Sequence, residues 1–154
     1  MVIPKKTFHD IVKNTPLISI DLIITPPNSF CLLGKRNNRP AKGFMFVPGG
    51  RIFKGEKIIA AFDRILISET GYKVKDHDKI SFQGVYEHFY EDSYHDRKTS
   101  THYVVLAYRL EVVKKFNVIL DRQHEKFEWV SVGNLLSRTD VHDNVKSYFG
   151  ENNS

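Results

Sequence analysis

A double glycine followed by a segment with helical periodicity is the feature that most limits the folds open to this chain. Pro48-Gly49-Gly50 follows a short strand-like run over 44–47. Glycines at such a turn let the backbone approach another group closely or adopt a positive φ. Beyond the turn, apolar residues recur at helical spacing at Ile58, Ala61, Phe62, Ile65 and Leu66. Gly71 stands where a C-terminal cap belongs, so the sequence predicts a strand, a glycine turn and a long amphipathic helix.

Strand-like segments flank this helix on both sides. Residues 17–25 are β-branched and almost continuously apolar, which predicts a buried strand, and 30–35 are expected to return as its hairpin partner. Two longer strands are expected over 79–90 and 102–113, joined by a polar loop that we expect to be exposed and mobile. A last strand is expected over 127–130. This mixture of strands and helix predicts an α/β fold.

Three shorter helical segments complete the predicted elements. Thr7 can cap a helix that ends by Thr15, and Ser131 can cap one that runs through Leu136. A further helical stretch is expected over 141–149.

Length and charge narrow the class of protein. The chain has 154 residues, enough for one domain over 1–154 and too few for two full ones. No apolar run reaches the roughly 18 to 20 residues of a membrane span, and the polar start after Met1 is unlike a signal peptide. We therefore expect a cytoplasmic protein with no membrane partner, in which Cys31 is a small buried residue. The net charge of +5 favours an anionic partner.

Asp21 is the unusual residue of the first predicted strand, because it places a carboxylate among apolar neighbours. A buried carboxylate needs a partner. The residue is therefore either the acceptor of an ion pair or cap, or part of a functional site.

The stretch from Gly50 to Tyr72, GRIFKGEKIIAAFDRILISETGY, resembles the Nudix box. The positions in register are Gly50, Glu56, Arg64, Glu69, Gly71 and Tyr72. In that family the box forms a loop, a helix and a loop that bind a divalent metal and a nucleoside diphosphate linked to another group. The resemblance implies a single Nudix domain, an α/β/α sandwich with a mixed sheet, and we expect Glu56 and Arg64 to support the box through an ion pair or backbone contact.

The box departs from the family pattern at two acidic positions. It usually has glutamates at the places of Ile65, Ser68 and Glu69, which lie at i, i+3 and i+4 and so share one helical face. Only Glu69 remains here. The site is expected to hold one metal ion, and a group outside the box must complete it.

Other segments resemble one Nudix subfamily, the GDP-mannose mannosyl hydrolases. They are NTPLISIDLII, LLGKRNNRPAKGFMFVPGGR, HFYED, THYVVLAYRL and DRQHEKFEWV. Members hydrolyse GDP-mannose at the anomeric carbon and release GDP and a hexose with inversion. The resemblance implies one Mg²⁺, or Mn²⁺, held by the Gly49 carbonyl, Glu69 and the Gln123 amide, and it makes His124 the general base.

The same matching gives further residues a role. Arg36 and Arg51 are candidates to clamp the diphosphate, because guanidinium groups suit phosphate oxygens. Three residues are candidates to form hydrogen bonds with the hexose hydroxyls or with the nucleotide base: Asp21, His88 and Tyr103. The resemblance also implies a homodimer and places three N-terminal residues near the guanine: Val2, Ile3 and Phe8.

The predicted function is a Mg²⁺-dependent hydrolase of GDP-mannose or a related GDP-hexose, such as GDP-glucose, with no nucleic-acid partner. One alternative is an ordinary Nudix pyrophosphatase that attacks phosphorus, although Ile65 and Ser68 lack the carboxylates that its chemistry normally uses. The other alternative is a Nudix module that binds a nucleotide or RNA without catalysis. Glu69, Gln123 and His124 argue against that second alternative.

Overall fold

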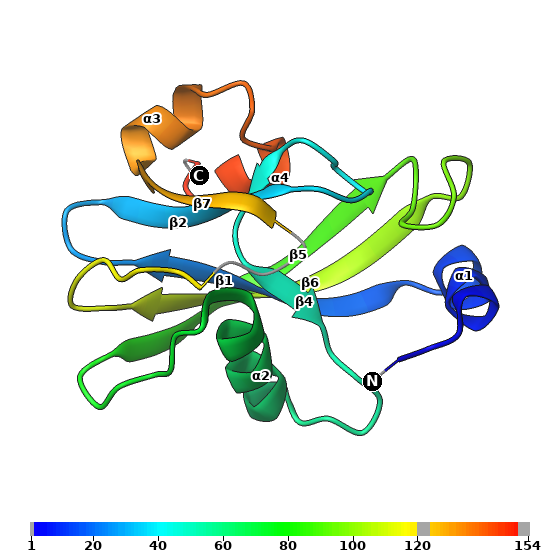
Figure 1. Ribbon diagram of the computed structural model, residues 1–154, viewed down its shortest axis with the longest axis horizontal. Coiled ribbons are helices and arrows are strands. Elements are labelled where there is room, and N and C mark those ends of the chain that lie inside the picture. The colour runs from blue at the N-terminus through cyan, green and yellow to red at the C-terminus, as the bar shows by residue number, and fades with distance from the viewer. Residues whose placement is uncertain (1, 120–123, 151–154) are drawn as a thin grey trace.

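Two sheets form the central layer of the molecule (Figure 1). The computed structural model describes residues 2–119 and 124–150, and only the backbone at 124 and 125. One sheet has the strand order β4-β1-β6-β5 and is mixed, because β1 runs parallel to β6 and antiparallel to β4. The other has the order β3-β2-β7 and is antiparallel.

The elements have the following bounds. The strands are β1 (Leu17–Thr25), β2 (Phe30–Arg36), β3 (Met45–Phe46), β4 (Gly49–Arg51), β5 (Lys79–Tyr90), β6 (Thr101–Glu111) and β7 (His124–Ser131). The helices are α1 (Lys5–Asn14), α2 (Ile58–Thr70), α3 (Val132–Ser137) and α4 (Asp143–Lys146).

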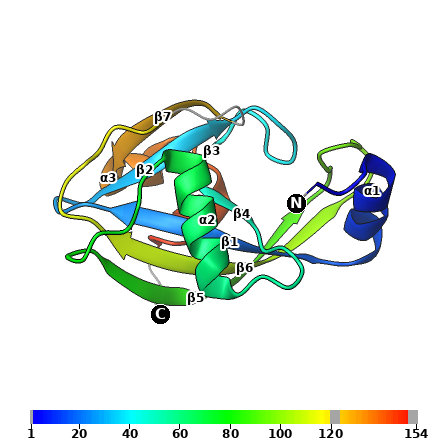
Figure 2. The same cartoon turned by 60° about the horizontal axis from the view of Figure 1, so that its bottom comes forward.

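Helices cover the sheets from both sides. Alternate residues of β1 point to opposite faces, so Ile20 and Leu22 pack with Phe62 of α2, whereas Ile23 packs with Leu135 and Val145 of the C-terminal helices. Figure 2 shows α2 lying across the four-stranded sheet. The expected α/β/α sandwich with a mixed sheet is confirmed.

The expected hairpin between 17–25 and 30–35 is wrong. β1 has β4 on one side and β6 on the other, so neither of its edges can accept β2. The turn between them takes positive φ angles of 79° at Asn28 and 59° at Ser29. β2 enters the other sheet, where it pairs with β3 and β7.

The predicted long helix is α2, and it ends as expected. Gly71 is its C-cap, with a left-handed φ of 76°, and its N–H donates to the carbonyl of Ile67. Ser131 caps α3, as predicted, by accepting a hydrogen bond from the N–H of Asn134. Among the described residues, none of the helices is long and apolar enough to cross a membrane.

Two helix boundaries differ from the prediction. The first helix begins at Lys5 with Pro4 as its N-cap, and Thr7 lies inside it without capping. Pro4 supplies the first helical acceptor, because its carbonyl takes a bond from the N–H of Phe8. The stretch over 141–149 forms only the short α4, after which the chain continues in tighter turns that bond residue i to i−3.

Candidate active site

A cavity of about 400 Å³ opens where α1, β1, β4, α2 and β5 meet. Eight residues that the sequence proposed for the site line it: Phe8, Asp21, Arg36, Gly49, Arg51, Glu69, His88 and Tyr103. They come from two helices, α1 and α2, and from five strands, β1, β2, β4, β5 and β6. The fold thus brings together residues separated by up to 95 positions in the sequence.

Four other proposed residues lie elsewhere or outside the description. Val2 is 95% exposed, and neither Val2 nor Ile3 is among the residues that line the cavity. Gln123 lies outside the described residues, as does the side chain of His124. The backbone of His124 is described and stands opposite Arg36 in the β2–β7 register.

The box helix presents one face to the cavity. Ile65, Ser68 and Glu69 all line it, as their i, i+3 and i+4 spacing predicts. Glu69 is a buried carboxylate, 7% exposed. Ile65 is fully buried and would contact a Cβ added at Gly50 at 3.2 Å, so this position is part of the packing and carries no charge.

Gly49 sits against Asp21 at the start of β4. The β1–β4 ladder uses bonds from the Leu22 N–H to the Pro48 carbonyl and from the Ile52 N–H to the Ile18 carbonyl. Because bonded and non-bonded pairs alternate, Gly49 and Asp21 form a non-bonded pair, and the Gly49 carbonyl points away from β1. A Cβ at Gly49 would lie 2.5 Å from Asp21 Oδ1.

Glu56 and Arg64 form the expected ion pair beneath the box. Arg64 Nε lies 2.7 Å from Glu56 Oε2, and Arg64 Nη2 donates to Glu56 Oε1 and to the carbonyl of Arg51. Glu56 also accepts from the N–H of Phe53. The hydrogen bonds from Arg64 and Phe53 lower the pKa of Glu56 to about 2. The pair fixes the end of β4 at Arg51 and the loop that follows it.

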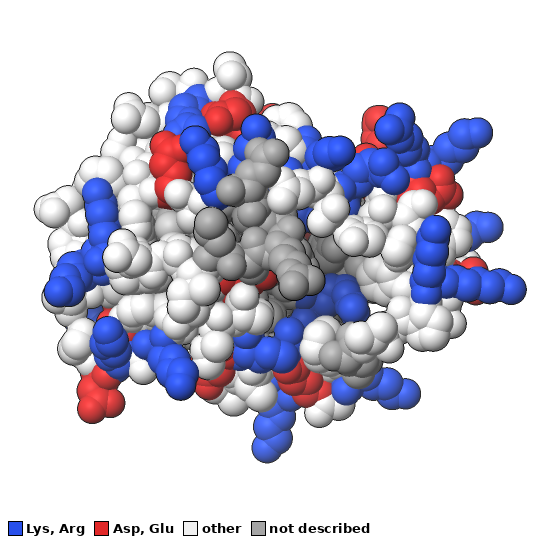
Figure 3. All heavy atoms as spheres, viewed as in Figure 1, with Lys and Arg blue, Asp and Glu red and all other residues white. Residues whose placement is uncertain are grey.

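Aromatic rings hold Arg51 at the mouth of the cavity. Its guanidinium lies 4.7 Å from the ring centroid of Phe8 and 5.5 Å from that of Phe53. Burial lowers the pKa of Arg51, but an arginine remains charged at neutral pH. The Nε of Arg36 donates to the Pro40 carbonyl at 2.9 Å, and its guanidinium lies 5.9 Å from the ring centroid of Phe46. Figure 3 shows basic side chains in the hollow to the right of centre.

Asp21 has a hydroxyl partner. The Tyr148 hydroxyl donates to Asp21 Oδ2 at 2.5 Å. Desolvation raises the pKa of Asp21 to about 6, although the Tyr148 bond and the nearby Arg36 charge oppose that rise. Asp21 also lines the cavity, so the two roles left open by the sequence, a partnered acceptor and a site residue, coincide here.

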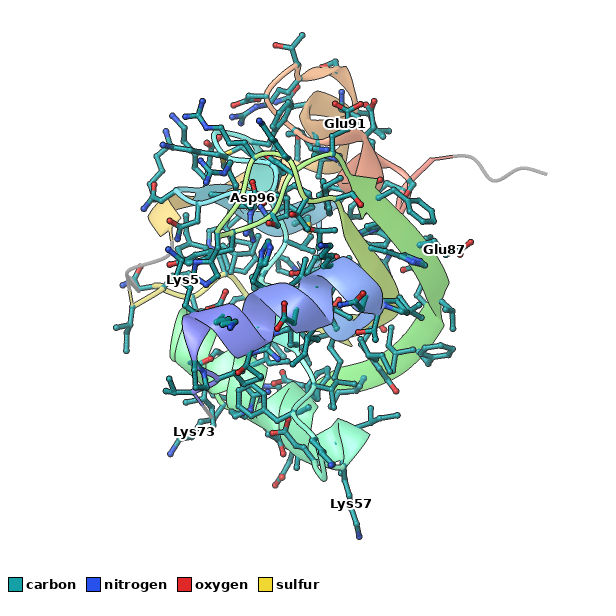
Figure 4. The ribbon with its side chains drawn as sticks, turned by 90° about the vertical axis from the view of Figure 1, so that its right-hand side faces the viewer. Lys5, Lys57, Lys73, Glu87, Glu91 and Asp96 are labelled. Atoms are coloured by element: carbon teal, nitrogen blue, oxygen red, sulfur yellow. The ribbon has the colours of Figure 1, made fainter. Side chains whose placement is uncertain are left out.

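His88 and Tyr90 line the same end of the cavity. They are two residues apart on β5 and so share a face, whereas Glu87, the residue before His88, points outward in Figure 4. Burial, with a smaller contribution from His142, lowers the pKa of His88 to about 4, so its imidazole is neutral at pH 7. Tyr90 was missed in the sequence, although strand alternation from His88 would have found it.

The loop over 91–100 closes one side of the cavity instead of lying fully exposed as expected. Ser93 is only 2% exposed, and its carbonyl accepts a bond from Arg39 Nε at 3.2 Å. His9 of α1 approaches Asp96 of the loop at 4.0 Å, and Figure 4 shows Asp96 above α1. The side chains of Arg39 and His9, which contact the loop, therefore draw it toward the rest of the protein. Arg39 and Tyr94, which the sequence did not single out, also line the cavity.

The oxygen donors fit a hard divalent cation. Glu69 offers a carboxylate, and Gly49 offers a carbonyl that β1 does not use, both ligand types that Mg²⁺ and Mn²⁺ prefer. Within the described ranges, no three His, Cys, Asp or Glu side chains cluster closely enough to hold a metal ion. An ion at this site would therefore depend on backbone and amide oxygens as well as on Glu69.

Comparison with known families agrees with this arrangement. The model of the NUDIX domain matches residues 15–149. This chain belongs to the Nudix hydrolase family. The low-salt glycan biosynthesis protein Agl8 of Haloferax volcanii is 36% identical over 126 residues, which cover 82% of this Nudix chain and 78% of that protein.

Two other relatives extend the comparison. The ADP-ribose pyrophosphatase of Methanocaldococcus jannaschii is 35% identical over 100 residues, 64% of this chain and 52% of that enzyme. The crystal structure of a MutT protein from Methanosarcina mazei Go1 superposes with a TM-score of 0.70 at 21% identity, covering 88% of this chain and 92% of that one. At that identity the likeness concerns the fold alone.

Proposed function

We propose that this Nudix hydrolase cleaves GDP-mannose, or a related GDP-hexose such as GDP-glucose, at the anomeric carbon of the sugar. The products are GDP and the free hexose, with inversion. One observation carries the proposal: the cavity is lined by arginines, Arg36 and Arg51 among them, and by a single box carboxylate, Glu69, while Ser68 and the buried Ile65 stand at the other acidic positions. The box therefore lacks two of the carboxylates that attack at phosphorus normally uses in this family.

Two arginines of the cavity suit a diphosphate. Arg51, held by two aromatic rings, and Arg36, held by a backbone carbonyl, can each donate to phosphate oxygens. We propose that one Mg²⁺ or Mn²⁺ is held by Glu69, the Gly49 carbonyl and Gln123. Such an ion neutralises negative charge on a diphosphate, which makes GDP a better leaving group.

Three other residues of the cavity suit an uncharged sugar. Asp21 offers acceptor oxygens, and His88 is neutral at pH 7 because burial lowers its pKa to about 4. Tyr103 adds a hydroxyl to the same wall of the cavity. Desolvation raises the pKa of Tyr103, so it keeps its proton and can donate. We propose that these three residues bond hexose hydroxyls.

The reaction then needs one base. We propose that His124 takes a proton from water, whose oxygen bonds to the anomeric carbon as the bond from that carbon to the phosphate oxygen breaks. The electron pair of the broken bond stays on GDP. Histidine is a common general base near neutral pH. The position of the His124 backbone opposite Arg36, a cavity residue, supports the assignment.

A homodimer belongs to the same proposal. Val2 is exposed outside the cavity of its own chain. We propose that Val2 and Ile3 approach the guanine bound by a second copy, while Phe8 contacts the nucleotide within its own chain.

The relatives point in two directions. The name of Agl8 assigns that protein to glycan biosynthesis, which fits a sugar-nucleotide substrate. The Methanocaldococcus relative is named an ADP-ribose pyrophosphatase, which favours the second candidate, a pyrophosphatase. The loss of carboxylates at positions 65 and 68 favours the first.

Product analysis separates the candidates. The protein is incubated with Mg²⁺ and, separately, with GDP-mannose, GDP-glucose and ADP-ribose, and the products are resolved by ion-exchange chromatography. We expect GDP and free hexose from the GDP-sugars. GMP with hexose 1-phosphate, or AMP from ADP-ribose as the main activity, would show a pyrophosphatase. Binding of these compounds without turnover would show a non-catalytic module.

A further inference from the structure

The C-terminal segment over 142–148 packs behind the cavity residues that we propose to bind the hexose. His142 caps α4 by accepting from the N–H of Asn144 at 3.1 Å, and its ring lies 4.9 Å from that of Phe46. Asn144 Nδ2 donates to the hydroxyl of Tyr90 at 3.1 Å. This segment therefore contacts cavity residues from behind, although it contributes none of the residues that line the cavity.

Tyr148 contacts two of these cavity residues, Asp21 and His88. It is 5% exposed, and its hydroxyl lies 2.5 Å from Asp21 Oδ2 and 3.4 Å from His88 Nε2. Its ring packs edge-on against Tyr86 at 4.7 Å, and its carbonyl accepts a bond from Gln83. One buried hydroxyl thus joins the two groups proposed to bind the hexose, which come from β1 and β5.

The hydrogen count at this hydroxyl fixes the roles of its neighbours. Tyr148 has a single hydroxyl hydrogen, and the shorter contact assigns it to the Asp21 carboxylate. Towards His88 the hydroxyl oxygen can then only accept, so a hydrogen bond there requires the proton of the neutral imidazole on Nε2. That tautomer leaves Nδ1 of His88 as an acceptor, and Asp21 Oδ1 remains a second acceptor.

We propose that Tyr148 is a positioning residue for the sugar site: it orients Asp21 and fixes the Nε2–H tautomer of His88, so that both present acceptors to hexose hydroxyls. This inference rests on the proposed function, because it concerns the residues that would bind the hexose in that same cavity. It predicts that the effect of Tyr148 depends on the hexose and is absent for GDP alone.

Steady-state kinetics of Tyr148→Phe test the inference. The variant keeps the buried ring and removes only the hydroxyl. We expect kcat/KM for GDP-mannose to fall about tenfold or more, since misplaced binding groups lower the rate steeply. We expect the inhibition constant of GDP to change less than twofold. Tyr86→Phe is the matched control. It removes a hydroxyl behind the same wall that accepts a hydrogen bond from Gln83 Nε2, whereas Asp21 is bonded by Tyr148. This variant should leave kcat/KM unchanged.

A second measurement does not need turnover or a stable variant. Two-dimensional NMR of ¹⁵N-labelled imidazoles reports the tautomer of His88 in the wild-type protein. We expect the Nε2–H form, and we expect that preference to weaken in Tyr148→Phe. An Nδ1–H tautomer in the wild type, an unchanged kcat/KM in Tyr148→Phe, or an equal loss of GDP affinity would each overturn the inference. Wild-type protein that leaves GDP-sugars intact would instead refute the proposed function.

Discussion

Replacing Gly49 by alanine tests whether the close pairing of β4 with β1 builds the site. An added Cβ would lie 2.5 Å from Asp21 Oδ1 and 2.8 Å from the Ile20 carbonyl oxygen. Ordinary contact distances are above 3.4 Å. The Ile20 carbonyl cannot yield easily, because β1 is held between β4 and β6. The strand β4 must therefore move away, and with it the Gly49 carbonyl and Arg51.

The cost follows from this geometry. Forcing extra atoms into a packed site costs about 1 to 3 kcal/mol. For a domain of this size, each kcal/mol lowers Tm by roughly 2 to 4 °C. We therefore expect Gly49→Ala to lower Tm by roughly 2 to 12 °C, and to weaken Mg²⁺ activation because the carbonyl is displaced.

Two other glycines serve as controls. Gly50→Ala meets only the side chain of Ile65 at 3.2 Å, which can shift, so its effect should be smaller. Gly133→Ala lies in α3 with no atom within 4 Å of the new Cβ and should be neutral or stabilising, as alanine is in helices. Differential scanning calorimetry and Mg²⁺ titration of activity provide the readout. A Gly49→Ala protein as stable and as active as Gly133→Ala would refute the reasoning.

Three further predictions concern single side chains. Native Asp21 keeps its proton up to about pH 6, whereas the unfolded residue ionises near 3.8, so its contribution to stability falls as pH rises between these values. Asp21→Asn should remove this pH dependence of the free energy of unfolding, which amounts to roughly 3 kcal/mol between the two pKa values. Urea unfolding with EDTA present measures it at several pH values. A variant that keeps the pH dependence of the wild type would contradict the prediction. His124→Ala should lower kcat by a factor of about 10² to 10⁴ and retain Mg²⁺ affinity. The control is His77→Ala, which removes an exposed ring and should leave kcat unchanged. Glu69→Gln should weaken Mn²⁺ binding measured by electron paramagnetic resonance, and wild-type affinity would remove Glu69 from the metal site.

Local sequence signals were sufficient for the box. The apolar spacing of α2, the left-handed cap at Gly71 and the ion pair of Glu56 with Arg64 all involve residues within a few turns of one another. The almost continuous run of apolar, β-branched residues over 17–25 also predicted a buried strand correctly. Such features are predictable because their partners are close in sequence.

Long-range partners were not predictable in the same way. Strand alternation does not say which strand pairs with which, so β2 was assigned to β1, although β4 and β6 occupy both edges of that strand. Asp21 was recognised as needing a partner, but its donor, Tyr148, lies 127 residues away in an unremarkable segment. Polarity predicted an exposed loop after β5, whereas contacts with Arg39 and α1 draw it over the cavity.

The position of the bond that breaks tests the central claim most directly. GDP-mannose is hydrolysed with Mg²⁺ in ¹⁸O-labelled water, and the products are weighed by mass spectrometry soon after reaction. Label in free mannose, with unlabelled GDP, is the result that attack at the anomeric carbon predicts. A control with mannose alone measures exchange of its anomeric oxygen with the solvent. Label on phosphorus, in GMP or in mannose 1-phosphate, would contradict the account and identify a pyrophosphatase.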